Sequence, residues 1–268
     1  MKIGIIGAGH LGKAFIAGLI RSGMEPQQII LNVRSAETAN AVRRVYPGIH
    51  VTEDKKELAA EADMIVVVVK ARNAGDVFTE IRDTDLADKT IISFMAGVTL
   101  NDMRDMLRGA HGEYRLVRMM PNVGIALCKG VIGVCCEEDS SGTKPAVDVF
   151  RRLGYIIRLP EEKLENITIC AASGLAFTAY LMKAYRDSCD RLIRDAAVSE
   201  EIALHVFENV ADMVRSGDNT FESLIEQIST KGGTTEAGIS ALRNSDLDGI
   251  INQCLDSAYA RVNELKGN

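Results

Sequence analysis

The sequence lacks the excess of positive charge that nucleic acids and anionic membranes attract. Its 31 lysines and arginines are outnumbered by 37 aspartates and glutamates, which gives a formal net charge of −6. Its six cysteines contain no C-x-x-C pair and no metal-ligand spacing, and nothing at the N-terminus resembles a signal peptide. We therefore expect a cytoplasmic protein with reduced thiols, no bound metal, and neither a nucleic-acid nor a membrane partner.

The chain also lacks an uninterrupted apolar run long enough to span a membrane. The most apolar long stretch, Ile167–Met182, is broken by polar residues and a glycine and is followed by Lys183. It falls short of the roughly 20 residues that a spanning helix needs. With 47% hydrophobic residues over 268 positions, the chain can bury a full core, and we interpret this stretch as a buried helix.

The N-terminal segment carries the strongest local pattern. Lys2–Ile6 is typical of a short buried strand, and Lys13–Ser22 predicts a helix. Between them Gly7, Gly9 and Gly12 follow the spacing G-x-G-x-x-G. In this context Gly7 permits the tight turn, Gly9 lets a pyrophosphate approach the backbone, and Gly12 brings helix and strand together. The pattern predicts a dinucleotide site with its phosphates at the helix N-terminus.

The end of the second predicted strand indicates which nicotinamide cofactor is bound. Ile29–Val33 forms this strand, and Arg34 and Ser35 follow it. Enzymes that use NAD place a carboxylate here for the ribose 2′-hydroxyl, whereas an arginine accommodates the 2′-phosphate of NADP. This chain has the neutral Asn32, then Arg34, which can pair with phosphate, and the Ser35 hydroxyl. We expect NADPH, with NADH possible; in the alternative interpretation Arg34 is a solvated surface charge.

Buried strands alternate with helices up to Pro160. The strands are apolar, β-branched runs of the kind found in parallel sheets, and beyond Pro160 apolar residues recur at helical spacing instead. We predict an α/β fold with a Rossmann-type doubly wound sheet in residues 1–160 and an all-helical C-terminal domain in residues 161–268. The later strands are expected at Met64–Val69, Thr90–Phe94, Arg115–Met119, Val131–Cys136 and Tyr155–Leu159.

An apolar stripe on the last predicted helix indicates that copies of the chain associate. Its members recur at helical spacing, and Ser245 precedes them as a helix cap. Part of the stripe could belong to the core of the chain itself. A helical domain of about 100 residues with this much apolar surface is more easily covered by a second copy, so we expect a homodimer or higher homo-oligomer. The stripe consists of Leu247, Ile250, Ile251, Cys254, Ala258, Val262 and Leu265.

Together these motifs resemble the pyrroline-5-carboxylate reductase family. Besides the N-terminal glycines and Arg34-Ser35, the landmarks are VVVVK ending at Lys70, SFMAGVTL around Ala96-Gly97, RMMPN at Arg118–Asn122 and GGTT at Gly232–Thr235. The resemblance covers essentially the whole chain. It implies NAD(P)H-dependent reduction of the cyclic imine 1-pyrroline-5-carboxylate to L-proline, in proline biosynthesis. It also implies a helical domain that binds substrate and dimerises, with the active site between the two domains.

Several motifs depart from the family pattern. Lys70–Arg72 stands where the family usually has lysine, proline and glutamine, and Gly124 and Phe177 replace a proline and a tyrosine. These changes leave two alternative functions open. The protein could be a reductase of a different cyclic imine carboxylate, such as the six-membered homologue, or a non-catalytic NADPH-binding regulatory paralogue. A β-hydroxyacid dehydrogenase would need a catalytic lysine soon after Gly174, and none occurs before Lys183.

The stretch STKGGTTEAG is predicted to hold the substrate. Gly232 and Gly233 expose backbone amides, and a helix starting at Thr234 would add its positive dipole end, so the stretch suits an imine carboxylate. Thr235, or alternatively Thr234, would point a hydroxyl at the imine nitrogen and relay a proton from water. By resemblance, Thr235 matches the family's proposed proton donor. Thr230 completes the expected substrate site; the alternative is a plain glycine turn between helices.

The nicotinamide is predicted at the carboxyl edge of the sheet, where ligands bind in open α/β folds. Lys70 and Asn122 each end a strand there, although Lys70 could be an ordinary surface lysine and Asn122 a turn residue. The full set of expected cofactor-binding residues is Gly7, Gly9, His10, Leu11, Gly12, Asn32, Arg34, Ser35, Lys70, Ala96, Gly97 and Asn122.

Overall fold

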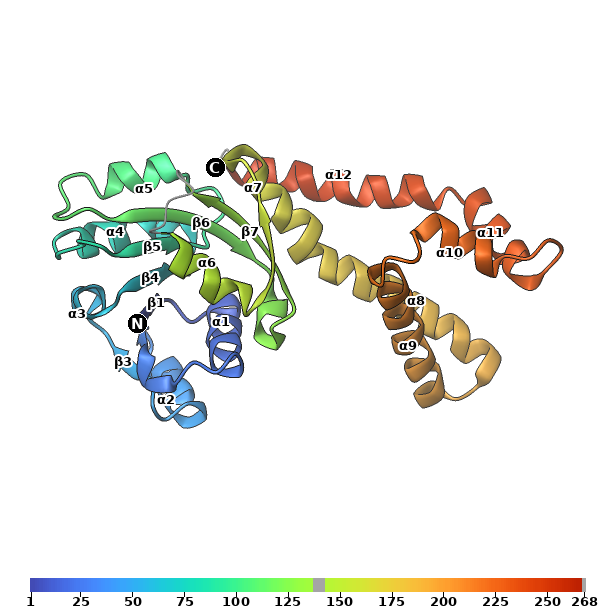
Figure 1. Ribbon diagram of the computed structural model, residues 1–268, viewed down its shortest axis with the longest axis horizontal. Coiled ribbons are helices and arrows are strands. Elements are labelled where there is room, and N and C mark those ends of the chain that lie inside the picture. Colours follow the sequence, from blue (N-terminus) through green and yellow to red (C-terminus); the bar gives the residue numbers. More distant parts are fainter. Residues whose placement is uncertain (137–142, 267–268) are drawn as a thin grey trace. The chain divides into compact units, whose positions relative to one another are not determined.

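The chain folds into two compact units, Met1–Ala172 and Ser173–Asn268. The computed structural model describes residues 1–136 and 143–266. The first unit holds one sheet with helices on both faces, and the second consists of helices (Figure 1). The predicted fold class, a Rossmann-type sheet followed by a helical C-terminal region, is therefore confirmed.

The first unit is built on an eight-stranded sheet with the order β3-β2-β1-β4-β5-β6-β7-β8. β1 to β6 run parallel, β7 runs antiparallel to β6, and β8 runs parallel to β7. The first six strands have the Rossmann order, in which ligands bind outside the carboxyl ends of the strands. The strands are β1 (Ile3–Ile6), β2 (Ile29–Asn32), β3 (His50–Thr52), β4 (Met64–Val67), β5 (Thr90–Ser93), β6 (Arg115–Pro121), β7 (Gly130–Cys136) and β8 (Gly154–Arg158).

All the predicted strands are present, and the structure adds β3, which the sequence did not indicate. β3 has three residues, of which only Thr52 is buried, so it carries no apolar run. It pairs with β2 in a register that sets Ile30 opposite His50. Asn32 Nδ2 reinforces this pairing by donating to the carbonyl oxygen of Thr52 at 3.2 Å.

Apolar clusters on the two faces of the sheet form the core of the first unit. α1, α2 and α6 cover one face, and α3, α4 and α5 cover the other (Figure 1). The rings of Phe15, Phe94 and Phe150 meet with centroids 5.1–5.6 Å apart and join α1 and α6 to the end of β5. The helices are α1 (His10–Arg21), α2 (Ala36–Val45), α3 (Lys55–Glu61), α4 (Ala74–Arg82), α5 (Leu100–Met106) and α6 (Lys144–Arg151), with the 3-10 turns η1 (Pro26–Gln28), η2 (Ala71–Asn73) and η3 (Val123–Leu127).

The helix α7 (Glu161–Ile167) belongs to the first unit. It contacts β6 and β7, and its residues Leu164 and Ile167 pack with Met120 in a small apolar cluster. The chain continues as a π-helical segment, Thr168–Ser173. The compact first unit thus ends at Ala172, whereas the sequence pattern changes at Pro160, and the predicted domain boundary stays a prediction.

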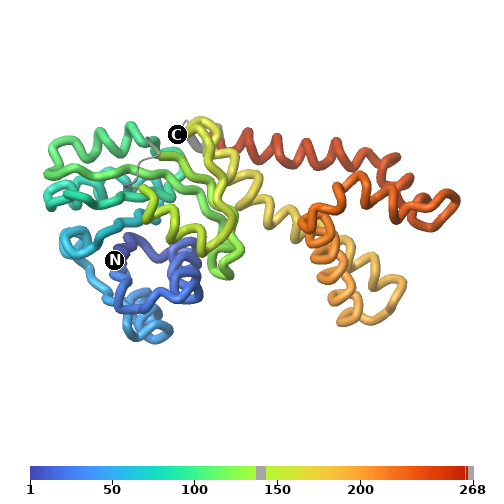
Figure 2. The backbone as a smooth tube through the Cα atoms, in the orientation of Figure 1, coloured from blue at the N-terminus to red at the C-terminus, as the bar shows by residue number. Residues whose placement is uncertain are grey.

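The second unit leaves much of its apolar surface uncovered. α8 and α9 lie against each other, with the rings of Tyr185 and Phe207 edge to face at 5.9 Å. No residue of α8 is buried, and Tyr180 and Leu192 are 73% and 84% exposed. The interpretation of Ile167–Met182 as a buried helix is therefore wrong for its part in α8, because too few neighbouring helices of the single chain cover that part. Ile167 and Ile169, which precede α8, are buried. Figure 2 follows the chain through α8 (Gly174–Ile193), α9 (Ala196–Arg215), α10 (Phe221–Ile228), α11 (Thr234–Asn244) and α12 (Leu247–Lys266).

The predicted apolar stripe lies on α12 and is not the core of the single chain. None of its described side chains is buried, and Ile250 is 56% exposed; the side chain of Leu265 lies outside the described ones.

By length and composition alone, the helical stretch Glu161–Ile193 also meets the criterion for a membrane span, because α7, the π-helical segment and α8 follow one another without a break. Uncovered apolar helix surface of this extent marks a place where another molecule binds.

We expect the stripe on α12 to lie in an interface between copies of the chain. Ile250→Asp would then place an unpaired charge in that interface, and the dissociation constant of the oligomer should rise at least about 100-fold, as expected for a buried unpaired charge. Light scattering at micromolar concentration measures this. Gln253→Asp on the same helix, at an exposed position outside the stripe, is the matched control. An unmodified chain that is monomeric, or equal oligomer sizes for both variants, contradicts the prediction.

Candidate functional site

A cleft of about 740 Å³ opens at the carboxyl ends of β1, β2 and β4. Residues 32–38, which lead from β2 into α2, form one wall, and residues 68–80, which lead from β4 through η2 into α4, form the other. Because β1 lies between β2 and β4 in the sheet, the glycine loop lies between these walls. The size of the cleft is within the range of cofactor sites.

The three glycines of the loop differ in the space around them. Gly7 has a φ of 108°, and a Cβ on it would lie 2.5 Å from the carbonyl oxygen of Val68. A Cβ on Gly12 would lie 2.4 Å from the carbonyl oxygen of Gly7, whereas nothing lies within 4 Å of a Cβ on Gly9. Gly7 and Gly12 are therefore required for packing, and Gly9 leaves the cleft open.

The N-terminus of α1 carries no negative charge that would repel an anion. α1 begins at His10, with Gly9 as its N-cap, and has no acidic residue in its first turn. The amides of His10, Leu11 and Gly12 lack partners within the helix, as first-turn amides do. These donors and the positive end of the helix dipole suit a phosphate group.

The wall after β2 contains the residues expected to select the cofactor. Asn32 is buried, and its amide is engaged with β3. Ser35 caps α2 by accepting the Thr38 amide at 3.3 Å, which leaves its hydroxyl proton free to donate. Arg34 is exposed, and no hydrogen bond or ion pair links its side chain to a described residue.

Positive charge gathers in the cleft although the chain as a whole is acidic. Arg34, Lys70 and Arg72 line it as exposed cations without a carboxylate partner among the described residues. A fourth cation, Lys55, is paired with Glu80 at 2.8 Å. Set against the net charge of −6, this local excess of cations favours a polyanionic ligand such as a dinucleotide.

The structure brings six of the expected cofactor residues into this cleft and leaves the rest outside its lining. The six are Gly7, Gly9, Asn32, Arg34, Ser35 and Lys70. His10, Leu11 and Gly12 contribute the start of α1, while Ala96 and Gly97 follow β5 and Asn122 follows β6. Their contact with a cofactor stays a prediction.

The side chain of Asn122 already makes three hydrogen bonds within the protein. Its Oδ1 accepts the amides of Gly124 at 3.1 Å and Val131 at 3.2 Å, and its Nδ2 donates to the carbonyl oxygen of Ala171 at 3.0 Å. It is 4% exposed. These contacts fix η3, β7 and the π-helical segment. They also explain why glycine is accepted at position 124, since a proline there would lack the amide that Asn122 binds.

Sequence reasoning did not single out the buried side chain of Arg118. It is 1% exposed, and its Nη1 and Nη2 lie 2.9 Å from Glu161 Oε1 and 2.6 Å from Glu165 Oε1. The same two oxygens accept the amides of Leu100 at 2.7 Å and Gly97 at 2.9 Å. Arg118 thereby joins β6 and α7 to the loop between β5 and α5. The sequence signal that could have revealed this network was an arginine inside an apolar strand, because a buried charge needs a partner.

The predicted substrate stretch forms the N-terminus of α11 in the second unit. α11 begins at Thr234, as expected. The Gly232 amide donates to Glu236 Oε2 at 2.6 Å, and the Gly233 amide donates to the carbonyl oxygen of Thr230 at 2.9 Å. The two amides expected to hold a carboxylate are therefore occupied in this structure. Thr234 is exposed and Thr235 half-buried, and neither hydroxyl is bonded to a described residue.

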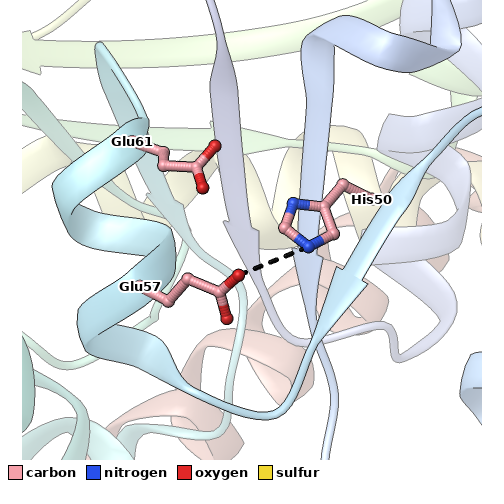
Figure 3. Close-up of side chains that lie close together, drawn as sticks. All are labelled: His50, Glu57 and Glu61. Atoms are coloured by element: carbon pink, nitrogen blue, oxygen red, sulfur yellow. Dashed lines mark ion pairs between the residues drawn. The ribbon is translucent and has the colours of Figure 1, made fainter.

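One cluster of described residues has the composition of a metal site. His50 on β3 and two glutamates of α3, Glu57 and Glu61, place their donor atoms within 4.8 Å of one another (Figure 3). His50 Nε2 lies 3.4 Å from Glu57 Oε1, and Glu57 also accepts the Thr52 hydroxyl. Glu61 is hydrogen-bonded to Lys2, which lowers the pKa of that carboxyl. All three donors are exposed, and each glutamate already has a protein partner.

The glycine loop, the strand order and the cation-lined cleft define a Rossmann-type dinucleotide-binding protein with a helical second unit. A family model described as NADP oxidoreductase, coenzyme F420-dependent, matches residues 2–97. A model described as pyrroline-5-carboxylate reductase dimerisation matches residues 161–265. The chain belongs to the pyrroline-5-carboxylate reductase family.

Relatives of the same family match along their full length. The chain is 26% identical to pyrroline-5-carboxylate reductase 2 of Bacillus subtilis (strain 168), over 99% of this chain and 95% of that protein. It is 28% identical to the pyrroline-5-carboxylate reductase of a Staphylococcus saprophyticus strain, over 99% and 98%. The solved structure of a pyrroline-5-carboxylate reductase from Coxiella burnetii superposes with a TM-score of 0.86 at 27% identity, over 98% of each chain. A Plasmodium falciparum pyrroline carboxylate reductase with NADP bound shares the fold, with a TM-score of 0.85 at 22% identity over 100% and 98%.

Removing the charge of Glu165 should destabilise the first unit strongly. Glu165→Gln keeps the shape but leaves the buried Arg118 with a single carboxylate partner, and breaking a buried pair costs about 3–5 kcal/mol. Urea denaturation measures the change in the free energy of unfolding. Asp148→Asn, which removes an exposed partner of Arg151 at 2.9 Å, is the control and should cost less than about 1 kcal/mol. Similar costs for both variants would show that the Arg118 network does not support the fold.

Proposed function

We propose that the protein reduces 1-pyrroline-5-carboxylate to L-proline with NADPH, as an oxidoreductase of proline biosynthesis in the cytoplasm. The observation that carries this proposal is the full-length likeness to pyrroline-5-carboxylate reductases, together with a cleft that has the shape and charge for a dinucleotide. When bound, the reduced nicotinamide supplies the hydride to the imine carbon.

The residues of the cleft fit NADPH. The open space beside Gly9 and the free first-turn amides of α1 suit the pyrophosphate. At the end of β2 no carboxylate competes with a 2′-phosphate, and Arg34 and the Ser35 hydroxyl can both donate to it. Lys70, exposed after β4, adds positive charge toward the nicotinamide half. Gly97 is already bonded to Glu165, so with Ala96 it would act by shaping the backbone after β5.

The helix α11 holds the groups that suit the substrate. The first-turn amides of Thr234 and Thr235 can bind the carboxylate without displacing a protein partner. Gly232 would bind it only after releasing Glu236, and Gly233 only after releasing Thr230. The Thr235 hydroxyl delivers a proton to the imine nitrogen, which becomes more basic as the carbon is reduced. A threonine hydroxyl is a weak acid, so it relays the proton from water.

We further propose that the working form is a homodimer or a larger homo-oligomer joined through the C-terminal helices. The match to the dimerisation model over residues 161–265 supports this. So does the exposure of apolar side chains along α8 and α12, which a second copy would cover.

A direct assay tests the activity. With NADPH as reductant, the purified protein should consume the five-membered imine carboxylate with a higher kcat/KM than the six-membered homologue, and proline should accumulate in step with NADPH oxidation. Faster turnover of the six-membered ring would change the assigned substrate. Tight NADPH binding without turnover of either imine would instead identify a regulatory protein.

The role of Thr235 is tested by removing its hydroxyl. Thr235→Val keeps the shape and β-branching, so kcat should fall by about 10²–10⁴-fold, the usual worth of general acid assistance, while KM changes little. Thr234→Val is the matched control, one residue earlier in the same helix turn, and should retain most of the wild-type kcat. A Thr235→Val enzyme that keeps more than about a third of its turnover would exclude this residue as the proton donor. Thermal melting of both variants separates loss of chemistry from loss of folding.

A further inference from the structure

The second wall of the cleft contains a cation with no assigned role. Arg72 lies in η2, between the end of β4 and the start of α4, and lines the same cleft as Arg34. The two arginines come from opposite walls, because β1 and its glycine loop lie between β2 and β4. The inference drawn for Arg72 rests on the proposed binding of NADPH in this cleft.

Arg72 is free to contact a ligand. Its side chain is exposed, and no hydrogen bond or ion pair links it to a described residue. Two carboxylates of the same wall also line the cleft, Asp76 and Glu80. Glu80 is neutralised by Lys55 at 2.8 Å, and Asp76 lies outside ion-pair distance of Arg72. Nothing on its own wall therefore holds the guanidinium in place.

The cleft offers an adenine ring no aromatic partner. Among the described residues that line it there is no phenylalanine, tyrosine or histidine. A purine nevertheless binds more tightly when a planar group packs against its face. The largest planar side chains present are the guanidinium groups of Arg34 and Arg72. The amide of Asn32 is buried and already bonded.

We propose that Arg72 stacks its guanidinium on the adenine ring of the cofactor. A guanidinium group is planar and weakly hydrated, and it packs on π faces through cation–π attraction and stacking. Arg34, on the opposite wall beside Ser35, reads the 2′-phosphate, whereas Arg72 binds the part that NADPH and NADH share. Arg72 thus sets the affinity for the nucleotide, and Arg34 sets the preference between the two cofactors.

Binding of two cofactor fragments separates these roles. The probes are 2′,5′-ADP, which carries the phosphate that distinguishes NADP, and 5′-AMP, which lacks it; dissociation constants are measured by NMR titration of the full-length protein. Arg72→Gln should weaken both probes about 5-fold, the size expected of an exposed cation–π contact. Arg34→Ala should weaken 2′,5′-ADP at least about 10-fold and leave 5′-AMP nearly unchanged.

Two further variants make the test specific to stacking. Arg72→Lys keeps the charge but loses the planar group, so it should bind both probes as weakly as Arg72→Gln. Arg44→Gln removes an exposed arginine of α2 outside the cleft and should change neither constant. Thermal melting checks that every variant is folded.

The outcomes that overturn the inference are distinct from failure of the proposed function. Unchanged binding in Arg72→Gln, full rescue by Arg72→Lys, or a loss confined to 2′,5′-ADP each refutes stacking by Arg72. If the wild-type protein binds neither fragment nor NADPH, the nucleotide site itself is rejected, and the inference with it.

Discussion

The buried guanidinium of Arg118 is the interaction on which the carboxyl end of the sheet depends. A charge removed from water is costly unless it is paired and hydrogen-bonded, and Glu161 and Glu165 supply that pairing at 2.9 and 2.6 Å. Because the same carboxylates accept the amides of Gly97 and Leu100, one cation orders β6, α7 and the loop after β5 together. α7 is consequently part of the first unit, although its residues follow the helical pattern of the second.

The cofactor cleft depends on a different constraint, which is that most of its cations are not neutralised by a neighbouring carboxylate. The chain has more acidic than basic residues, yet the cations that line the cleft are mostly without carboxylate partners among the described residues. The glycines add a second condition, since the closest backbone approaches leave no room for a Cβ at Gly7 or Gly12. A polyanion therefore finds unpaired donors on both walls and at the start of α1.

The two glycine-rich stretches of the chain differ in what their amides do. In the loop after β1, the first-turn amides of α1 have no acidic neighbour. At α11 the preceding glycines are closed off by Glu236 and by the carbonyl oxygen of Thr230. The first stretch is open to a phosphate, whereas the second offers a smaller anion only its helical amides and two threonine hydroxyls. In the proposed function the first stretch binds the phosphates of the cofactor and the second binds the carboxylate of the substrate.

The sequence by itself determined every strand except β3, the glycine turn with its helix, and the pattern change after Pro160, because apolar periodicity and glycine spacing act within a few residues of the chain. Only the tertiary structure decided the partners of distant polar groups. Arg118 meets carboxylates 43 and 47 positions away, and Asn122 reaches a carbonyl 49 positions away. The short β3 and the exposure of α8 likewise depend on which neighbours cover them. Burial and hydrogen-bond satisfaction are set by segments far apart in the chain, and no local pattern encodes them.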